Sequence, residues 1–486
     1  MTIGSDHQTH DLPVIAIVGG GVSGTAVAFH LLQRRSLRPG QLFIFEPRER
    51  LGAGLAYDTR DPAHRINVPA ARMSLLTDDI EHFQRWIQEN DAVADDDDAL
   101  AANGSLFPRR AVFGNYINSM IHPFVEDGRL THIRQGVERI ARSGRSWTIT
   151  GEDGQRVDAD ILIIATSHPS PLPPHLLGEV LAGHPRFVPD PTTPEALVAI
   201  GADDRVLVVG NGLTSADVIA SLELRGHRGP ITAISRRGLR SRGHARVKQE
   251  LFGDFADHPS RTAVSLLRRV RAAIREAEGE GRSWQGVIDQ VRAQGRDLWQ
   301  ALPLEERRRV VRHLRPFWDV HRFRVAPQVE AVSEEAIETG RLEVLAASVA
   351  ALAVTDGVVN CRLRLSRSER SIERQYDAVV VTTGPGHRGI LQSQDWIEAL
   401  AGAGCLAMDP TGLGLACDTQ SRALDAAGAI VPSLFISGPL ARGTFGELMG
   451  LPEVVEHAVF VAGQVAAAIA EREKERRGAY PASSAA

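Results

Sequence analysis

Residues 14–46 read VIAIVGGGVSGTAVAFHLLQRRSLRPGQLFIFE, and this stretch decides the fold class of the chain. An apolar run meets a glycine-rich turn, a helix-like segment follows, and a second apolar run ends on Glu46. This is the order of a βαβ unit in which a G-x-G-x-x-G turn lets the backbone approach a pyrophosphate at a helix N-terminus. A carboxylate at Glu46 can accept the hydroxyl protons of an adenosine ribose and would repel a 2′-phosphate. The unit therefore predicts a site for FAD or NAD, with contacts at Gly19, Gly21, Ser23, Gly24 and Glu46.

A second unit of the same kind occupies residues 205–238. Its turn, GNGLTS, has Ser215 in place of the third glycine, and serine is small enough to keep the helix close. Its second apolar run ends on Ser235, Arg236 and Arg237 rather than on an acidic residue. A hydroxyl and two guanidiniums favour the 2′-phosphate of NADPH, although two arginines after a strand can also belong to an ordinary solvated loop. The predicted contacts are Gly210, Asn211, Gly212, Ser215, Ser235, Arg236 and Arg237.

An internal repeat follows the two units. Residues 128–167 and 340–384 both read as a strand, a three-stranded meander with glycine turns and a buried return strand. One plan used twice predicts an α/β fold with two Rossmann-like dinucleotide-binding domains, one for FAD and one for NADPH, with a helical insertion in the second. Two sites in one chain indicate a resident FAD and a visiting NADPH, because a hydride can pass from nicotinamide to flavin.

We place the first domain boundary at a proline-rich stretch, HPSPLPPHLLG, and the second at the end of the second repeat. Apolar residues at helical spacing, with arginine-rich outer faces, predict the helical insert. The acidic run at residues 95–98 is expected in a surface loop. The expected segments are 12–170 for the first part of the FAD domain, 185–384 for the NADPH domain with its insert at about 259–316, 385–474 for the second part of the FAD domain, and 475–486 for a disordered tail.

Composition narrows the classes of function. The 486 residues carry 55 Lys and Arg against 60 Asp and Glu, a net charge of −5, which offers no general attraction for nucleic acid or an anionic membrane. Three cysteines without CxxC spacing, and no His cluster, predict no metal site and no disulfide reductase chemistry. A polar start of the chain and the absence of an 18-residue apolar run lead us to expect a soluble, cytoplasmic protein.

The motifs resemble those of the two-dinucleotide flavoprotein superfamily, which includes Baeyer–Villiger, flavin-containing and N-hydroxylating monooxygenases. The segment GNGLTSAD looks like the NADPH motif of the N-hydroxylating enzymes. Outside the glycine turns, the chain resembles a bacterial FAD-NAD(P)-binding family. The segments that carry this resemblance are residues 52–76, 108–117, 317–327 and 382–385. Gly384 in the last segment is a predicted cofactor contact, as is Gly438, where a Gly-Pro pair replaces the Gly-Asp turn of related reductases.

The resemblance implies an NADPH-dependent FAD monooxygenase. In that chemistry NADPH reduces FAD, O₂ adds at flavin C4a, and the hydroperoxide transfers oxygen to a nucleophilic substrate. Some relatives oxidise the amine of aspartate, so we expect N-hydroxylation of an amino acid such as aspartate, with a small-molecule substrate and O₂ as partners and a homo-oligomer left open. The Baeyer–Villiger fingerprint is absent between the glycine motifs, which argues against ketone oxygenation. The alternatives are an NADPH-dependent flavin reductase or oxidase, and a protein that holds FAD structurally.

Catalytic candidates lie in the segments that carry the family resemblance. Asn67 could hydrogen-bond a flavin carbonyl or cap a loop. Arg65 and Arg72 could clamp a substrate carboxylate or pair at the surface. His64 and His321 could carry protons near neutral pH or be structural histidines.

Overall fold

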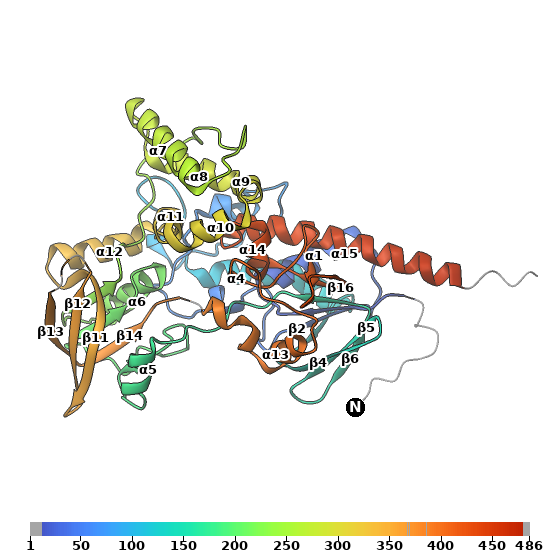
Figure 1. Ribbon diagram of the computed structural model, residues 1–486, viewed down its shortest axis with the longest axis horizontal. Helices are drawn as coiled ribbons and strands as arrows, with labels where there is room; N and C mark the ends of the chain where they lie inside the picture. The colour runs from blue at the N-terminus through green and yellow to red at the C-terminus, as the bar shows by residue number, and fades with distance from the viewer. Residues whose placement is uncertain (1–11, 367, 369, 385, 480–486) are drawn as a thin grey trace, which may run out of the picture.

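The computed structural model describes residues 12–366, 368, 370–384 and 386–479. The strands of this part form two large sheets with parallel cores and one small antiparallel sheet (Figure 1). In the view of Figure 1 the first large sheet lies at the right and the second at the left, with the helices of the insert above them. The arrangement confirms an α/β fold class with two Rossmann-like units.

The first sheet has the strand order β15-β16-β7-β1-β2-β3. Its parallel strands β1 and β7 are buried at every position, as expected when helices cover both faces. Although β16 comes from the last quarter of the chain, it pairs directly with β7, so two distant segments build one sheet. The strand bounds are β1 (Ile15–Val18), β2 (Leu42–Phe45), β3 (Thr131–Ile133), β7 (Ile161–Ile164), β15 (Arg422–Leu424) and β16 (Ile430–Ile436).

The second sheet has the order β13-β12-β11-β10-β9-β14-β8. Its core, from β11 to β8, is parallel, and β12 and β13 continue it as antiparallel strands. The bounds are β8 (Phe187–Val188), β9 (Val206–Val209), β10 (Ile231–Ser235), β11 (Leu342–Thr355), β12 (Val358–Leu365), β13 (Ser371–Tyr376) and β14 (Ala378–Val381).

The two meanders differ, which corrects the expected repeat. After the first unit, β4 (Val137–Ser143), β5 (Ser146–Gly151) and β6 (Arg156–Ala159) form a separate sheet. After the second unit, the parallel strand and the first meander strand are one continuous strand, β11, with an irregularity between Val349 and Ala351. The prediction of a separate strand before the meander was therefore wrong for the second repeat, because no turn interrupts residues 342–355.

The helical insert follows β10 and has a small core of its own, which includes Phe255, Val287 and Leu298. Helical structure continues past residue 316, because Pro316 lies in the first turn of α11 and does not interrupt it. The insert is therefore longer than the expected 259–316. Its helices are α7 (Ala263–Gly279), α8 (Trp284–Ala293), α9 (Gly295–Ala301), α10 (Leu304–Arg309), η3 (Val310–Leu314) and α11 (Arg315–Arg322), and α12 (Pro327–Glu338) leads back to the sheet.

The remaining helices connect and cover the sheets. In the first domain they are α1 (Val22–Arg34), α2 (Gly54–Tyr57), η1 (Ala70–Arg72), α3 (His82–Glu89), η2 (Asp97–Ala99) and α4 (Arg110–Glu126). Further along the chain they are α5 (His175–Val180), α6 (Leu213–Leu224), η4 (His387–Gln392), α13 (Asp395–Gly402), η5 (Gly438–Ala441), α14 (Arg442–Phe445) and α15 (Leu451–Ala479).

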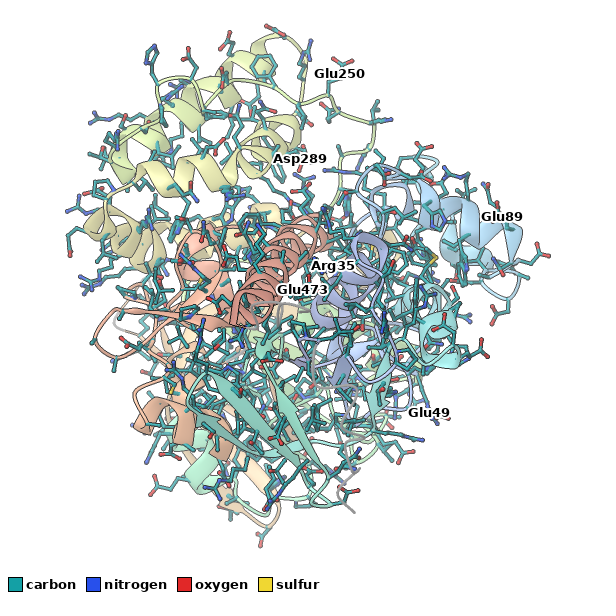
Figure 2. All side chains as sticks on the ribbon, turned by 90° about the vertical axis from the view of Figure 1, so that its right-hand side faces the viewer. Arg35, Glu49, Glu89, Glu250, Asp289 and Glu473 are labelled. Carbon is teal, nitrogen blue, oxygen red and sulfur yellow. The ribbon has the colours of Figure 1, made fainter. Side chains whose placement is uncertain are left out.

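The long helix α15 packs along α1 (Figure 1). Its residues Ala458, Val461 and Val465 have no exposed surface. Near the far end, Arg35, directly after α1, and Glu473 of α15 form an ion pair of 2.7 Å and lie side by side in Figure 2. Since α15 extends to residue 479, residues 475–479 of the expected disordered tail are helical, and residues 480–486 lie outside the described part.

Residues 451–475 of α15 are long and apolar enough to cross a bilayer, judged by length and composition alone. The helix contributes residues from Leu451 to Ile469 to the largest hydrophobic core, which it shares with α1. Burial against α1 accounts for this apolar composition without a membrane.

Candidate functional site

The first glycine turn lies at the carboxyl end of β1, as predicted. Gly19 has a φ of +100°, and a Cβ there would lie 2.8 Å from the carbonyl oxygen of Ala165 on the neighbouring strand. A Cβ on Gly24 would collide with the carbonyl of Gly19, so only glycine lets α1 approach the turn this closely. The N-cap of α1, Gly21, provides no side-chain hydrogen bond to the first turn. The backbone N–H groups of that turn thus fit a pyrophosphate.

Glu46 is buried at the end of β2, beside this turn. Its carboxylate accepts hydrogen bonds from the backbone N–H of Gly20 at 3.0 Å and of Arg48 at 3.1 Å, and it pairs with the Arg48 guanidinium at 3.0 Å. These contacts fix the carboxylate against the glycine turn. A carboxylate has about four lone-pair positions, so a ribose contact is compatible with them and stays a prediction.

The ends of β7 and β16 form the other side of the first site. Thr166 Oγ1 and Ser437 Oγ, each just after one of these strands, are buried without a hydrogen-bond partner among the described residues. Gly438 follows Ser437 and lies so close to Ser23 of α1 that a Cβ would collide with the Ser23 hydroxyl. Unpartnered hydroxyls at the carboxyl edge of a parallel sheet fit a polar cofactor such as FAD.

His457 of α15 holds the Gly438 turn and was not predicted from the sequence. The Gly438 N–H donates to His457 Nδ1 at 3.1 Å, and His457 Nε2 lies 2.9 Å from the hydroxyl of Ser421. Burial lowers the pKa of His457 to about 3, so the ring is neutral at physiological pH. With Nδ1 accepting, Nε2–H donates to Ser421. An imidazole thus fixes the turn where related reductases often have a Gly-Asp pair.

The second glycine turn repeats this plan at the end of β9. Gly210 has a φ of +121° and packs against Thr382 at the end of β14. The side-chain amide of Asn211 and the hydroxyls of Ser215 and Ser235 are buried without hydrogen-bond partners in the described part. A small cavity beside Asn211 and Ser215 is also lined by Gly212, Arg240, Val325 and Glu330, among others. Orphaned polar groups next to a glycine turn at the carboxyl end of parallel strands fit a nicotinamide dinucleotide.

Basic side chains follow β10 on this second site. Arg236 is exposed, and the Arg237 guanidinium lies 5.4 Å from the ring centre of Phe317 in α11. With the hydroxyl of Ser235, they fit a 2′-phosphate. Arg240, which the sequence analysis missed, pairs with Glu334 of α12 at 2.6 Å. Gly384 follows β14 with a φ of +80° and open space on its Cβ side, and its cofactor contact stays a prediction.

No hydrogen bond or ion pair among the described residues joins one predicted catalytic residue directly to another. Asn67 contributes its backbone carbonyl to a 3.0 Å hydrogen bond with His244 Nε2. Arg72, whose side chain is 47% exposed, lies 3.8 Å from Asp289 of α8. His321 donates from Nδ1 to the carbonyl of Phe317 at 2.7 Å and stacks edge-to-face on a tryptophan of the insert. Of the three residues, Arg72 has the longest polar contact, the 3.8 Å pair with Asp289.

Arg65 does not fit the predicted role of a substrate clamp. Its guanidinium is buried and pairs in a bidentate manner with Asp96 at 2.7 and 2.9 Å, and it also donates to the carbonyl of Phe107 at 3.0 Å. The expectation of a surface loop at residues 95–98 is likewise wrong for Asp96, which is 5% exposed. A buried cation requires a paired anion, and the acidic run supplies it.

The two domains are joined by polar contacts next to the second glycine turn. Arg110 of α4 pairs with Asp217 of α6 at 2.8 Å and donates to the carbonyl of Arg65. His64 bonds Thr59 through Nδ1 at 2.8 Å and lies 3.2 Å from the Ser221 hydroxyl of α6 through Nε2. Burial is the main cause that lowers the pKa of His64. Two segments with family resemblance therefore serve the domain interface, and His64 is structural.

The insert meets the last segment of the FAD domain through buried ion pairs. Arg322 of α11 pairs with Glu447 at 2.5 Å, and Arg292 of α8 pairs with Glu453. Trp318 donates to Glu447 at 3.1 Å. Although burial opposes ionisation of Glu447, the guanidiniums of Arg322 and its neighbours hold its pKa below the usual value. The insert is thus fixed over the carboxyl edge of the first sheet.

Comparisons with known proteins agree with this geometry. Residues 16–169 match the family model described as FAD-NAD(P)-binding. The first domain is a FAD-NAD(P)-binding domain. This match confirms FAD and NAD(P)H as the class of cofactor, and no curated protein matches the chain.

Solved structures share the fold over nearly the whole chain. Ornithine hydroxylase from Pseudomonas aeruginosa has a TM-score of 0.63 and 16% identity, covering 94% of this chain and 100% of that one. L-lysine 6-monooxygenase from Pseudomonas syringae has a TM-score of 0.61 and 18% identity, covering 95% and 99%. The FAD-bound cadaverine monooxygenase from Erwinia amylovora has a TM-score of 0.59 and 12% identity, covering 98% and 100%. At these identities the likeness establishes the fold.

Proposed function

We propose that this protein is an NADPH-dependent FAD monooxygenase that N-hydroxylates a small primary amine. The observation that carries the proposal is the likeness in fold, over nearly the whole chain, to an ornithine hydroxylase, an L-lysine 6-monooxygenase and a cadaverine monooxygenase. It is supported by two glycine turns whose surroundings fit two nucleotides and by an insert fixed over the first sheet.

The overall reaction would consume one NADPH, one proton and one O₂ per amine and yield the hydroxylamine, NADP⁺ and water. When bound and reduced, FAD supplies the activation of O₂, at flavin C4a as the sequence analysis predicts. The residues of the chain have the simpler tasks of binding both nucleotides, positioning the amine and excluding water.

Each nucleotide has a set of residues to hold it. FAD would lie against Gly19, Gly21, Ser23, Gly24, Glu46 and Gly438, and NADPH against Gly210, Asn211, Gly212, Ser215 and Gly384, with its 2′-phosphate at Ser235, Arg236 and Arg237. The basic end of β10 supports NADPH over NADH, since Glu46 stands at the equivalent place in the first unit. A binding assay that compares NADPH with NADH can test this preference.

We assign proposed roles to the three catalytic candidates. Arg72 is weakly engaged by Asp289 and could orient a substrate anion, while Asn67 could hydrogen-bond the flavin edge. His321, already bonded through Nδ1, has Nε2 free for proton transfer among the described contacts. Aspartate is the first substrate to try, followed by the amines of the structural relatives.

The test combines product analysis with rapid kinetics. We expect NADPH oxidation to be coupled to a product 16 mass units heavier than the amine, and reduced enzyme mixed with O₂ to give a species that absorbs in the near-ultraviolet. Direct return to oxidised flavin, with hydrogen peroxide as the only oxygen product for every amine, would favour the alternative of a reductase or oxidase. A cytoplasmic location and a homo-oligomer stay predictions for cell fractionation and light scattering.

A further inference from the structure

Arg442 is a buried cation for which the described residues provide no partner. It begins α14, directly after the turn at residues 438–441, and it is 5% exposed. Its guanidinium makes no hydrogen bond and no ion pair with any described residue, and its Nε is sealed from solvent without a partner. A charged side chain this deeply buried is expected to meet an anion in the working enzyme.

The charges around Arg442 are already matched with one another. The charges that act most strongly on its guanidinium are those of Glu447, Arg315, Asp319 and Arg322. Arg322 pairs with Glu447 at 2.5 Å, and Arg315 pairs with Asp319 at 3.2 Å. Two anions and two cations cancel, so Arg442 is the surplus positive charge of the group.

The position of Arg442 is that of a ligand site. It follows β16, and its charge acts on His168, which follows the neighbouring strand β7. Burial and, after it, the charge of Arg442 lower the pKa of His168 to about 4, so this histidine adds no positive charge at neutral pH. In open α/β sheets ligands bind outside the carboxyl ends of the strands, and here α11 of the insert is tied to the segment after β16 through the pair of Arg322 with Glu447.

Other anions of the proposed cofactors have sites elsewhere. The pyrophosphate of FAD fits the N-terminus of α1, and the 2′-phosphate of NADPH fits Ser235, Arg236 and Arg237. The predicted carboxylate clamp Arg65 is neutralised by Asp96. A single planar guanidinium between the first sheet and the insert matches one carboxylate, which it can bind through two parallel hydrogen bonds.

We propose that Arg442 binds a carboxylate of the substrate, and that the substrate class is therefore amines that also carry a carboxylate. This proposal rests on the proposed N-hydroxylation. It makes Arg442 the specificity-determining residue and predicts discrimination against diamines and against amides of the same shape, since neither supplies the anion that the buried guanidinium needs.

Ligand binding to the FAD-loaded enzyme tests the proposal without turnover. Succinate, L-aspartate and the neutral isostere succinamide are titrated while the flavin absorbance is followed. We expect the wild type to bind both dicarboxylates at least about 100-fold more tightly than succinamide, because a buried guanidinium left without its anion is costly. Arg442→Gln should lose this preference, and Arg442→Lys should keep a part of it, since lysine retains the charge without the fork. Arg312→Gln, at an exposed arginine between α10 and α11, is the matched control and should behave as the wild type.

The same variants test whether the anion that Arg442 binds belongs to the substrate or to the flavin. FAD content and the flavin midpoint potential of Arg442→Gln and Arg442→Lys should equal those of the wild type. Loss of FAD or a lowered potential, with the preference for dicarboxylates unchanged, would overturn the proposal and make Arg442 a partner of the cofactor. A wild type that does not distinguish succinate from succinamide would also overturn it, even if another amine is N-hydroxylated. If the preference for dicarboxylates depends on Arg442 but no amine is oxygenated, the result supports the carboxylate site and contradicts only the proposed N-hydroxylation.

Discussion

The first and second nucleotide-binding units use the same turn but differ at the end of the next strand. In the first, Glu46 is buried and bonded to the N–H of Gly20, so the turn and the strand end are locked together. In the second, Ser235 Oγ and the amide of Asn211 have no hydrogen-bond partner, and Arg236 is exposed. The end of β2 is therefore held by its own hydrogen bonds, whereas the end of β10 leaves a buried hydroxyl and an exposed guanidinium for a ligand.

Blocking the close approach of α1 to the first glycine turn should have the largest effect on the stability of the protein. Gly24→Val places side-chain atoms against the carbonyl of Gly19, whereas Ser215→Ala only shortens a side chain that already fits. We expect Gly24→Val to destabilise the protein by about 3 kcal/mol or more and to abolish FAD binding, and Ser215→Ala to cost about 1 kcal/mol or less. Thermal unfolding and the FAD content measure both. A Gly24→Val protein that retains FAD and its melting temperature would contradict the geometry.

Changing the basic residues at the end of β10 should weaken the binding of NADPH much more than the binding of NADH. We expect Arg236→Ala with Arg237→Ala to raise the Kd of NADPH about 100-fold, because each guanidinium contributes charge-assisted hydrogen bonds to the 2′-phosphate. The Kd of NADH should change less than about twofold, and the exposed Arg312→Ala should change neither. Titration of flavin reduction under anaerobic conditions gives both constants. Equal losses for the two cofactors would remove the argument for NADPH.

Breaking the contact between the units should have a smaller but measurable effect. Arg110→Ala leaves Asp217 of α6 buried without its partner and should lower the free energy of unfolding by about 2 kcal/mol. Asp217→Ala and the double variant complete a cycle, from which we expect a coupling energy of about 1 kcal/mol or more. Denaturant unfolding provides the values. Additive effects would show that the pair does not couple the domains.

Acid should act on the first unit through His457, with an effect on stability that is absent at neutral pH. The pKa of His457 is about 3 in the folded protein against an ordinary value of 6.5, so the unfolded chain binds the extra proton first. Its contribution to stability is full above pH 6.5 and is lost as the pH falls toward 3, at up to about 1.4 kcal/mol per pH unit. His457→Asn can still accept from the Gly438 N–H and should flatten the pH dependence of unfolding between pH 6 and 4. An unchanged slope would show that this histidine does not titrate as described.

The glycine turns could be predicted because their chemistry is local. A φ of +100° at Gly19 and a helix packed against its own turn at Gly24 require particular residues at fixed spacing. The long insert was also visible from its helical periodicity, although its end was not, because Pro316 can begin the first turn of α11 as readily as it can end a helix.

The candidate site was harder to predict because its partners are far apart in the chain. Arg65 and Arg442 are both arginines in segments rich in small and apolar residues. Only the folded chain brings Asp96 to Arg65 and leaves the Nε of Arg442 buried without a hydrogen-bond partner among the described residues. His457 lies 19 residues after the turn that it fixes, and no spacing rule connects the two.

The sequence by itself determined that this chain has two dinucleotide-binding units, and it predicted which nucleotide each strand end favours, since both depend on residues within one βαβ turn. Only the tertiary structure decided that Arg65 is neutralised by Asp96 and that the buried Nε of Arg442 has no hydrogen-bond partner among the described residues. Pairing of charges depends on distances across domains, and those distances exist only once β16, α15 and the insert have packed against the first sheet.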